Sequence, residues 1–143
     1  MKLQYHIALS LPVSAAVYAL SHSKAMAAAS FLAGVFTDID HVFDYMREYG
    51  LRCNPHAFFR SFSNTLYRKV VLPFHSWEIA VLLAAGAIAS HGDGAITGTL
   101  IGFAIHLAAD QMTNGPRAAG YFFTYRAVNG FVAKRIFPGK GIE

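Results

Sequence analysis

Charged residues are scarce in this chain. Asp, Glu, Lys and Arg make up 14% of its 143 residues, whereas hydrophobic residues make up 55%. Ordinary soluble domains carry roughly a quarter charged residues, so this chain has little polar surface with which to cover a globule. We therefore expect lipid or a partner to cover part of it.

Cysteine is nearly absent too. Cys53 is the only one, which excludes a disulfide within the chain. Internal repeats and low-complexity linkers are also lacking, and the length allows one domain with one core. We predict a single helical metal-binding domain over residues 1–143, with its core in 1–115 and an aromatic, basic interfacial tail in 116–143. His6 and Pro12 interrupt the apolar N-terminal stretch and no cleavage site is evident, so we treat this stretch as mature sequence.

Apolar residues are abundant in four segments. These segments are 7–21, 25–37, 77–90 and 95–109. They are rich in Ala, Leu and Gly without strand-like alternation, which predicts helices. Each is shorter than the roughly 20 residues that cross a bilayer comfortably, so they also suit the core of a soluble bundle. The second segment can continue through 38–46, and the fourth through 111–112.

Short connections join the segments in pairs. Residues 21–24 and 90–94 link neighbouring segments, and such short links make antiparallel hairpins. Residues 47–74 separate the two hairpins. The predicted fold is all-α, an antiparallel four-helix bundle embedded in a membrane, with a loop-rich insertion between the hairpins.

Basic residues fall on one side of this arrangement. Of the 12 Lys and Arg residues, 11 lie on the side of both termini, and only Lys24 lies on the other. The 11 are Lys2, Arg47, Arg52, Arg60, Arg68, Lys69, Arg117, Arg126, Lys134, Arg135 and Lys140. The positive-inside rule then predicts an inner-membrane protein with its termini in the cytoplasm. A soluble bundle whose long loops share one end remains the alternative.

His106 and Asp110 form the strongest candidate for a metal-binding pair. A separation of four residues places both side chains on one face of a helix, one turn apart, where both reach one cation. Burying either group in an apolar helix is costly unless it is paired or coordinated. A histidine hydrogen-bonded to the aspartate one turn later is the alternative.

Asp38-Ile39-Asp40-His41 forms a second pattern at the end of an apolar segment. If the helix continues, Asp38 and His41 share a face and Asp40 points elsewhere. Carboxylates near a helix C-terminus oppose the helix dipole, and a cation would remove this conflict.

Topology brings these patterns together. His6 and His75 begin the first and third helices, while Asp38 and the His106/Asp110 pair end the second and fourth. In an antiparallel bundle all of these residues lie at the same end. His22 and His91 fall at the opposite end, and His56 lies in the loop.

These motifs resemble the inner-membrane metal-dependent hydrolase family. The match covers roughly residues 1–115, through His6, Gly34-Val-Phe-Thr-Asp38-Ile-Asp40-His41, His75-Ser76 and Gly102-Phe-Ala-Ile-His106-Leu-Ala-Ala-Asp110. The family pattern has proline where this chain has Thr37, and threonine where it has Phe74. The resemblance implies about four membrane helices and a metal-dependent hydrolase.

A more distant similarity is to the zinc-dependent phospholipase C and single-strand nuclease fold. It implies one metal held by Asp38, His75, His106 and Asp110. A second metal would be held in part by His6, with Asp110 bridging the two. No histidine follows Asp110, so two metals is the upper limit.

The function expected from these patterns is metal-dependent hydrolysis, most readily of a phosphoester, at the cytoplasmic membrane face. A mixed His and carboxylate shell suits Zn2+, with Mn2+ or Fe2+ as alternatives, and His41 joins the candidate ligands. Asp40 ranks first as the base that activates water, ahead of Asp44 and Glu78.

The expected partners are membrane lipid and a small phosphorylated or lipid substrate, without nucleic acid. Basic residues that could bind phosphate, or lipid headgroups instead, are Arg47, Arg60, Arg68 and Arg117. Two alternatives stay open. One is a non-enzymatic membrane protein with a structural metal clamping the bundle end, and the other is a soluble phospholipase-like enzyme.

Overall fold

The computed structural model describes residues 3–50, 68–113 and 118–137, and these ranges are predominantly helical. Within them the β-type pairing is a single bridge between Lys69 and Val132. The helices are α1 (Leu3–Ser21), α2 (Lys24–Phe36), η1 (Thr37–Ile39), α3 (Asp40–Tyr49), α5 (Trp77–Ala89), α6 (Gly94–Thr113), η2 (Ala118–Tyr121), α7 (Phe123–Val128) and α8 (Ala133–Ile136). The predicted all-α class is confirmed.

The four apolar segments are helices, and the two predicted extensions are present. A single 3₁₀ turn, η1, joins α2 to α3, so the second segment runs on past Asp38. Helix α6 continues to Thr113, which places His106 and Asp110 inside a regular helix. The tight turns that follow α1 and α5 hold His22 and His91 in left-handed conformations, each with φ 53°.

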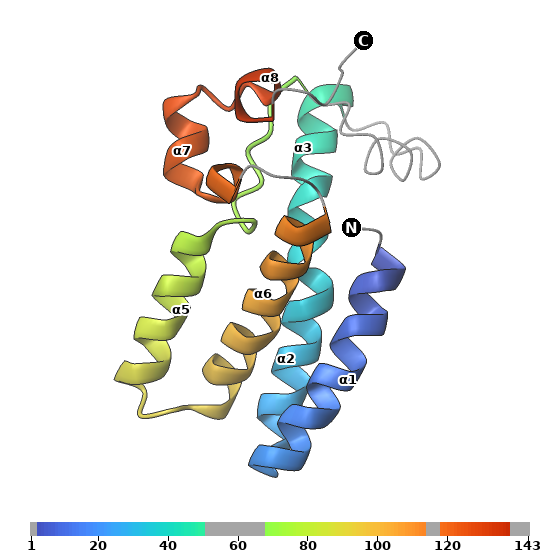
Figure 1. Ribbon diagram of the computed structural model, residues 1–143, viewed down its shortest axis with the longest axis vertical. Coiled ribbons are helices and arrows are strands. Elements are labelled where there is room, and N and C mark those ends of the chain that lie inside the picture. Colours follow the sequence, from blue (N-terminus) through green and yellow to red (C-terminus); the bar gives the residue numbers. More distant parts are fainter. Residues whose placement is uncertain (1–2, 51–67, 114–117, 138–143) are drawn as a thin grey trace.

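The long helices pack side by side in the order α5, α6, α2, α1 (Figure 1). The contact between α2 and α6 is close because Gly98 and Gly102 lie against the α2 backbone. A Cβ atom on Gly102 would overlap the Ser30 carbonyl oxygen, and one on Gly98 would overlap that of Met26. Small residues thus let two backbones approach directly.

Residues 118–137 are here called the C-terminal lobe. They lie beyond the end of the bundle at which α5 begins and α6 ends (Figure 1). The sequence predicted an interfacial tail here. In the structure, Ala133 of the lobe lies in a buried cluster with Tyr45, Val70 and Leu72. Backbone hydrogen bonds join the lobe to the segment before α5, from Val70 N to Phe131 O at 2.8 Å and from Ala133 N to Arg68 O at 3.0 Å. The lobe therefore covers the segment that carries His75.

Polar and apolar side chains are distributed unusually over the long helices. The buried residues of α1 are His6, Ser10 and Val17, whereas its Leu20 is 86% exposed. The only buried residue of α5 is Ala80, whereas its Ile88 is 79% exposed. Several buried positions are thus polar while large apolar side chains face outward.

Among the residues that the structure describes, two helical stretches are long and apolar enough to cross a membrane, Leu3–Ser21 and Lys24–Tyr49. The sequence-based expectation was about four such helices, and Trp77–Ala89 is shorter than a typical span. Signal sequences near an N-terminus and buried core helices of soluble proteins share this length and composition.

Candidate metal centre

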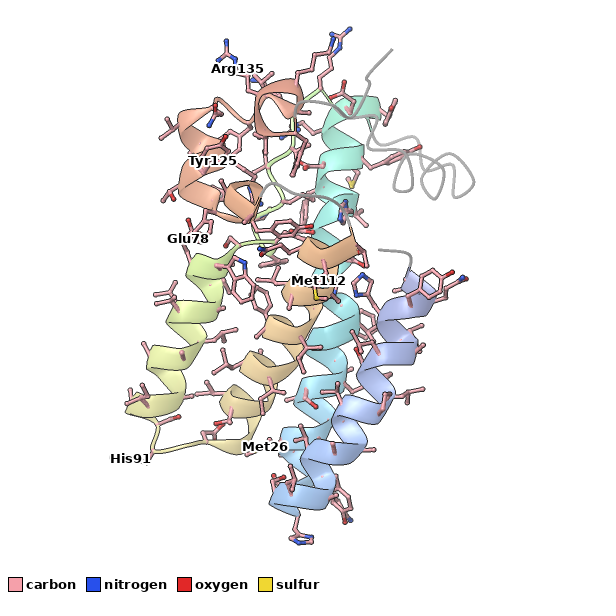
Figure 2. The ribbon with its side chains drawn as sticks, viewed as in Figure 1. Met26, Glu78, His91, Met112, Tyr125 and Arg135 are labelled. Atoms are coloured by element: carbon pink, nitrogen blue, oxygen red, sulfur yellow. The ribbon has the colours of Figure 1, made fainter. Side chains whose placement is uncertain are left out.

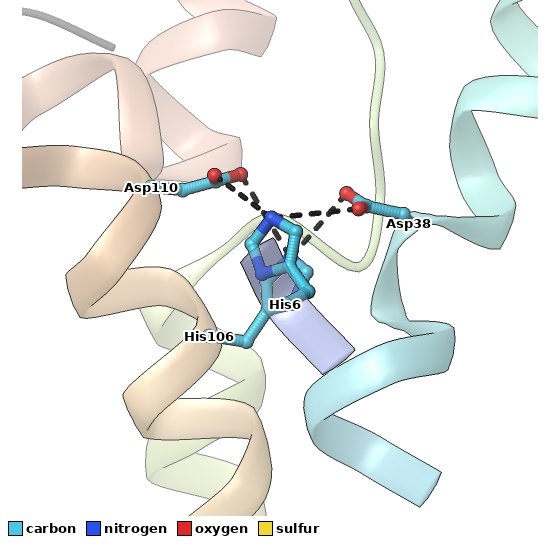
Figure 3. A group of neighbouring side chains, drawn as sticks. All are labelled: His6, Asp38, His106 and Asp110. Atoms are coloured by element: carbon cyan, nitrogen blue, oxygen red, sulfur yellow. Dashed lines mark ion pairs between the residues drawn. The ribbon is translucent and has the colours of Figure 1, made fainter. Parts of the chain in front are cut away.

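Histidine and aspartate side chains from separate segments converge at one end of the bundle. His6 lies in the first turns of α1, Asp38 in η1, His75 directly before α5, and His106 and Asp110 near the end of α6. All five are buried, and Figure 3 shows four of them around a common point. The sequence-based expectation that these residues meet is confirmed. His91 lies at the opposite end (Figure 2).

The two carboxylates lie between the imidazoles. His6 Nε2 is 3.2 Å from Asp110 Oδ1 and 3.5 Å from Asp38 Oδ2 (Figure 3). His75 Nε2 is 3.1 Å from Asp38 Oδ1 and 3.3 Å from Asp110 Oδ2. His106 Nε2 is 3.4 Å from Asp38 Oδ1 and 3.4 Å from His75 Nε2. Atoms that share one tetrahedral zinc ion at its usual bond lengths are roughly 3.4 Å apart, so the spacing fits a common cation.

Hydrogen bonds at the other ring nitrogens fix how two imidazoles face this point. His106 Nδ1 lies 2.8 Å from the Gly34 carbonyl oxygen, and His75 Nδ1 lies 3.1 Å from Asp40 Oδ2. Because a carbonyl or carboxylate oxygen only accepts, each Nδ1 carries the proton and donates. Nε2 of His75 and of His106 then faces the carboxylates, where it would bind a metal ion through its lone pair when it carries no proton. Metal-ligating histidines are oriented in this way.

Some buried atoms of the cluster lack a hydrogen bond. Both ring nitrogens of His6 and Oδ2 of Asp38 are buried without one among the described residues. Leaving such groups unsatisfied costs free energy, and coordination to a cation would remove the cost for His6 Nε2 and Asp38 Oδ2. These residues therefore fit a metal.

The electrostatics also favour positive charge here. Burial alone would lower the pKa of His75, but hydrogen bonds to Asp110, Asp38 and Asp40 raise it well above its ordinary value. The surrounding carboxylates thus stabilise a cation at the position of this imidazole.

The ligand atoms fall into two groups that share Asp38. One group is His6, Asp38, His106 and Asp110, and the other is Asp38, His41 and His75. The distant family similarity implied a different division, with Asp110 as the bridge. Asp110 also lies between imidazoles, since Oδ1 faces His6 and Oδ2 faces His75.

Asp40 has a different position from the one predicted. The sequence predicted that it points away from the cluster and activates water. In the structure it is fully buried, lies against His75 Nδ1 and accepts a hydrogen bond from Phe74 N at 2.8 Å. Asp40 therefore holds a candidate ligand in place, and its role as the base stays a prediction.

The other two candidate bases also have partners elsewhere. The Glu78 carboxylate accepts hydrogen bonds from the backbone N of Phe123 and Thr124, each at 3.0 Å, and from Thr124 Oγ1 at 2.8 Å. It binds the first turn of α7 in the C-terminal lobe (Glu78 and Tyr125 are labelled in Figure 2). Asp44 accepts from Val71 N at 2.9 Å and pairs with Arg47.

Of the proposed phosphate-binding residues, Arg47 lies 3.3 Å from Asp44, and Arg68 lies 3.9 Å from Glu48. Arg60, Arg117 and His56 fall outside the described residues.

The sequence did not indicate a role for Arg126 at this site. Its buried side chain donates a hydrogen bond to the backbone carbonyl of His75. It has no motif spacing that relates it to His75, so only the tertiary structure identifies it.

No protein-family model matches the chain, and neither a curated protein nor a solved structure matches it. The family resemblance therefore depends on the short motifs alone. Together with the geometry, it supports a buried His/Asp cluster that could hold a metal ion.

Proposed function

We propose that the chain is a membrane-associated metal-dependent hydrolase that acts on a phosphoester or phospholipid-like substrate. The observation that carries this proposal is the number of candidate ligands. A closed structural zinc site uses four protein ligands, whereas six residues in two groups offer ligand atoms here. Two groups of ligands that have Asp38 in common suit two metal ions.

The two groups suggest different roles. His6, Asp38, His106 and Asp110 offer four ligands, enough to close a site. Asp38, His41 and His75 offer three, which would leave a position for water or substrate. His41 is the least buried member, with its side chain 16% exposed, so access from its side is favoured. A metal bound here would lower the pKa of a bound water and stabilise charge on phosphoryl oxygens. Zn2+ suits the ligand set, with Mn2+ or Fe2+ as alternatives.

Location at a membrane is supported by the distribution of side chains. In a water-soluble protein, large apolar side chains are mostly buried and polar ones mostly exposed. The long helices show the opposite, with Leu20 and Ile88 exposed and His6 and Ser10 buried. The sequence pattern predicts 11 of the 12 basic residues on the side of both termini, so the site end would face the cytoplasm. Lipid is the expected partner of the apolar helix faces.

The structural clamp is the second candidate. Its support is that the four-ligand group, His6, Asp38, His106 and Asp110, comes from α1, η1 and α6. A metal there would tie these three helices together, as structural metals do. A clamp predicts one closed ion per chain and no hydrolysis.

Activity on defined phosphoesters tests the proposal. Full-length protein in detergent would be assayed on bis(p-nitrophenyl) phosphate and on phosphatidylcholine vesicles. We expect hydrolysis that chelator abolishes and added Zn2+ or Mn2+ restores. Metal binding without hydrolysis of either substrate would favour the clamp.

A further inference from the structure

Arg126 is a cation that the proposed chemistry does not use. It belongs to α7 in the C-terminal lobe, and its side chain is 1% exposed. Within the described residues it forms no ion pair with a carboxylate. A guanidinium buried in this way is costly unless hydrogen bonds satisfy it, so its partners indicate what it does.

Those partners are backbone carbonyl groups of two segments, the C-terminal lobe and the turn before α5. Nη1 donates to His75 O at 2.7 Å and to Gly120 O at 3.0 Å, and Nη2 donates to Leu72 O at 2.9 Å. Gly120 belongs to the lobe, whereas Leu72 and His75 form the turn that precedes α5. The planar guanidinium, with its nitrogens at fixed separations, suits this arrangement, whereas lysine has one nitrogen.

The turn that Arg126 holds is strained and carries a candidate ligand. Leu72 has φ 39°, in the left-handed region that a leucine rarely adopts. Its carbonyl oxygen also accepts a hydrogen bond from His75 N at 3.0 Å. Strained backbone of this kind persists only when surrounding contacts hold it. Without the guanidinium the turn can relax, which would move the His75 backbone and with it the ring.

We propose that Arg126 is a positioning residue of the metal centre, which clamps the Leu72–His75 turn so that His75 Nε2 faces Asp38 and Asp110. This inference depends on the proposed metal centre. It also gives the C-terminal lobe a role, because the lobe then sets the geometry of a site whose ligands all lie outside it.

Cobalt binding by the full-length protein in detergent tests the clamp. Metal-free wild type, Arg126→Lys, Arg126→Met and Ile136→Ala would be titrated with Co2+, whose visible spectrum reports coordination geometry. Ile136 is a buried residue of the same lobe and takes no part in the hydrogen bonds of Arg126. Its variant controls for destabilisation of the lobe, with thermal unfolding recorded for each protein.

We expect Arg126→Met to lower Co2+ affinity about tenfold to a hundredfold, the range seen for partners that orient metal ligands, and to alter the spectrum. Arg126→Lys keeps the charge but loses the two-nitrogen clamp, so we expect an altered spectrum and a loss of about tenfold. Ile136→Ala should keep affinity and spectrum despite its lower unfolding temperature.

If Arg126→Lys binds Co2+ with the affinity and spectrum of the wild type, the inference is overturned. The same variant tests the role of Arg126 if Arg126→Met does not fold. Loss of affinity in Ile136→Ala equal to that in the Arg126 variants would overturn it too, since general destabilisation would then explain the effect. Absence of cobalt binding by the wild type would refute the metal centre itself, and the inference with it.

Discussion

At the scale of single residues, the centre depends on carboxylates that lie between imidazoles. Asp38 and Asp110 each lie within 3.5 Å of His6 Nε2, and both lie within 3.3 Å of His75 Nε2. Without a metal, a proton on His75 is stabilised by these carboxylates, and a metal ion bound to the imidazoles would take the place of that positive charge. The negative charge of each aspartate should therefore be essential for binding.

Asp110→Asn tests this requirement. The substitution keeps the size of the side chain but removes the charge that would hold two dications close together, so we expect loss of metal and of hydrolytic activity. Asp93→Asn is the control, because Asp93 caps α6 at the opposite end by accepting from Ala95 N and Ile96 N, and asparagine caps helices about as well. Retained metal in Asp110→Asn would contradict this assignment.

Asp40→Asn separates a positioning role from a catalytic one. Asparagine can still accept from His75 Nδ1 but is a weaker acceptor, so we expect metal affinity to fall about tenfold. Isothermal titration with Zn2+ measures the change. If affinity is unchanged while hydrolysis disappears, Asp40 is the base that the sequence predicted.

At the scale of helices, the close contact of α2 and α6 sets the positions of the ligands. The Gly34 carbonyl oxygen of α2 accepts from His106 Nδ1 of α6, which requires the backbones to approach closely. Gly102 lies on α6 one turn before His106 and permits that approach.

Gly102→Ala should force the two helices apart. The added Cβ would overlap the Ser30 carbonyl oxygen, and Gly34 N would lie 2.9 Å away. We expect a loss of about 1–3 kcal/mol in the free energy of unfolding, with weaker metal binding. Gly86→Ala is the matched control, because the nearest atom to its Cβ would be Ile96 Cγ2 at 3.6 Å. In a helix interior it should be neutral or stabilise by about 0.5–1 kcal/mol. Equal effects of both substitutions in denaturant unfolding would refute the close-contact argument.

The sequence predicted the helices and the convergence of the ligands because both follow from local patterns. Apolar segments and short links determine an antiparallel arrangement, and that arrangement brings His6, Asp38, His75 and Asp110 together. The position of Asp40 did not follow, because the 3₁₀ turn at Thr37–Ile39 changes the rotation per residue. Nothing in the apolar pattern indicates this turn.

The lobe was beyond sequence reasoning for a different reason. Arg126 meets Leu72 and His75 across more than 50 positions of the chain. Such contacts have no periodicity to detect. The same holds for the hydrogen bonds of Glu78, a predicted candidate base, to the first turn of α7.

At the scale of the whole molecule, the exposed apolar faces of the long helices must be shielded from water, and we expect lipid to shield them. We predict that the protein stays in the membrane fraction during carbonate extraction and that a cytoplasmic reporter fused to the C-terminus is active. The reason is the basic bias toward that side. A C-terminal fusion active only in the periplasm would contradict the orientation, and release by carbonate would contradict spanning helices.

The proposed function requires the buried His/Asp cluster to bind metal. Elemental analysis of full-length protein purified without chelator measures this binding. We predict one or two transition-metal ions per chain, with zinc the most abundant, and their loss after dialysis against chelator together with a lower unfolding temperature. Protein that is folded and carries no stoichiometric metal, and that takes up none when Zn2+, Mn2+ or Fe2+ is supplied, would contradict the account.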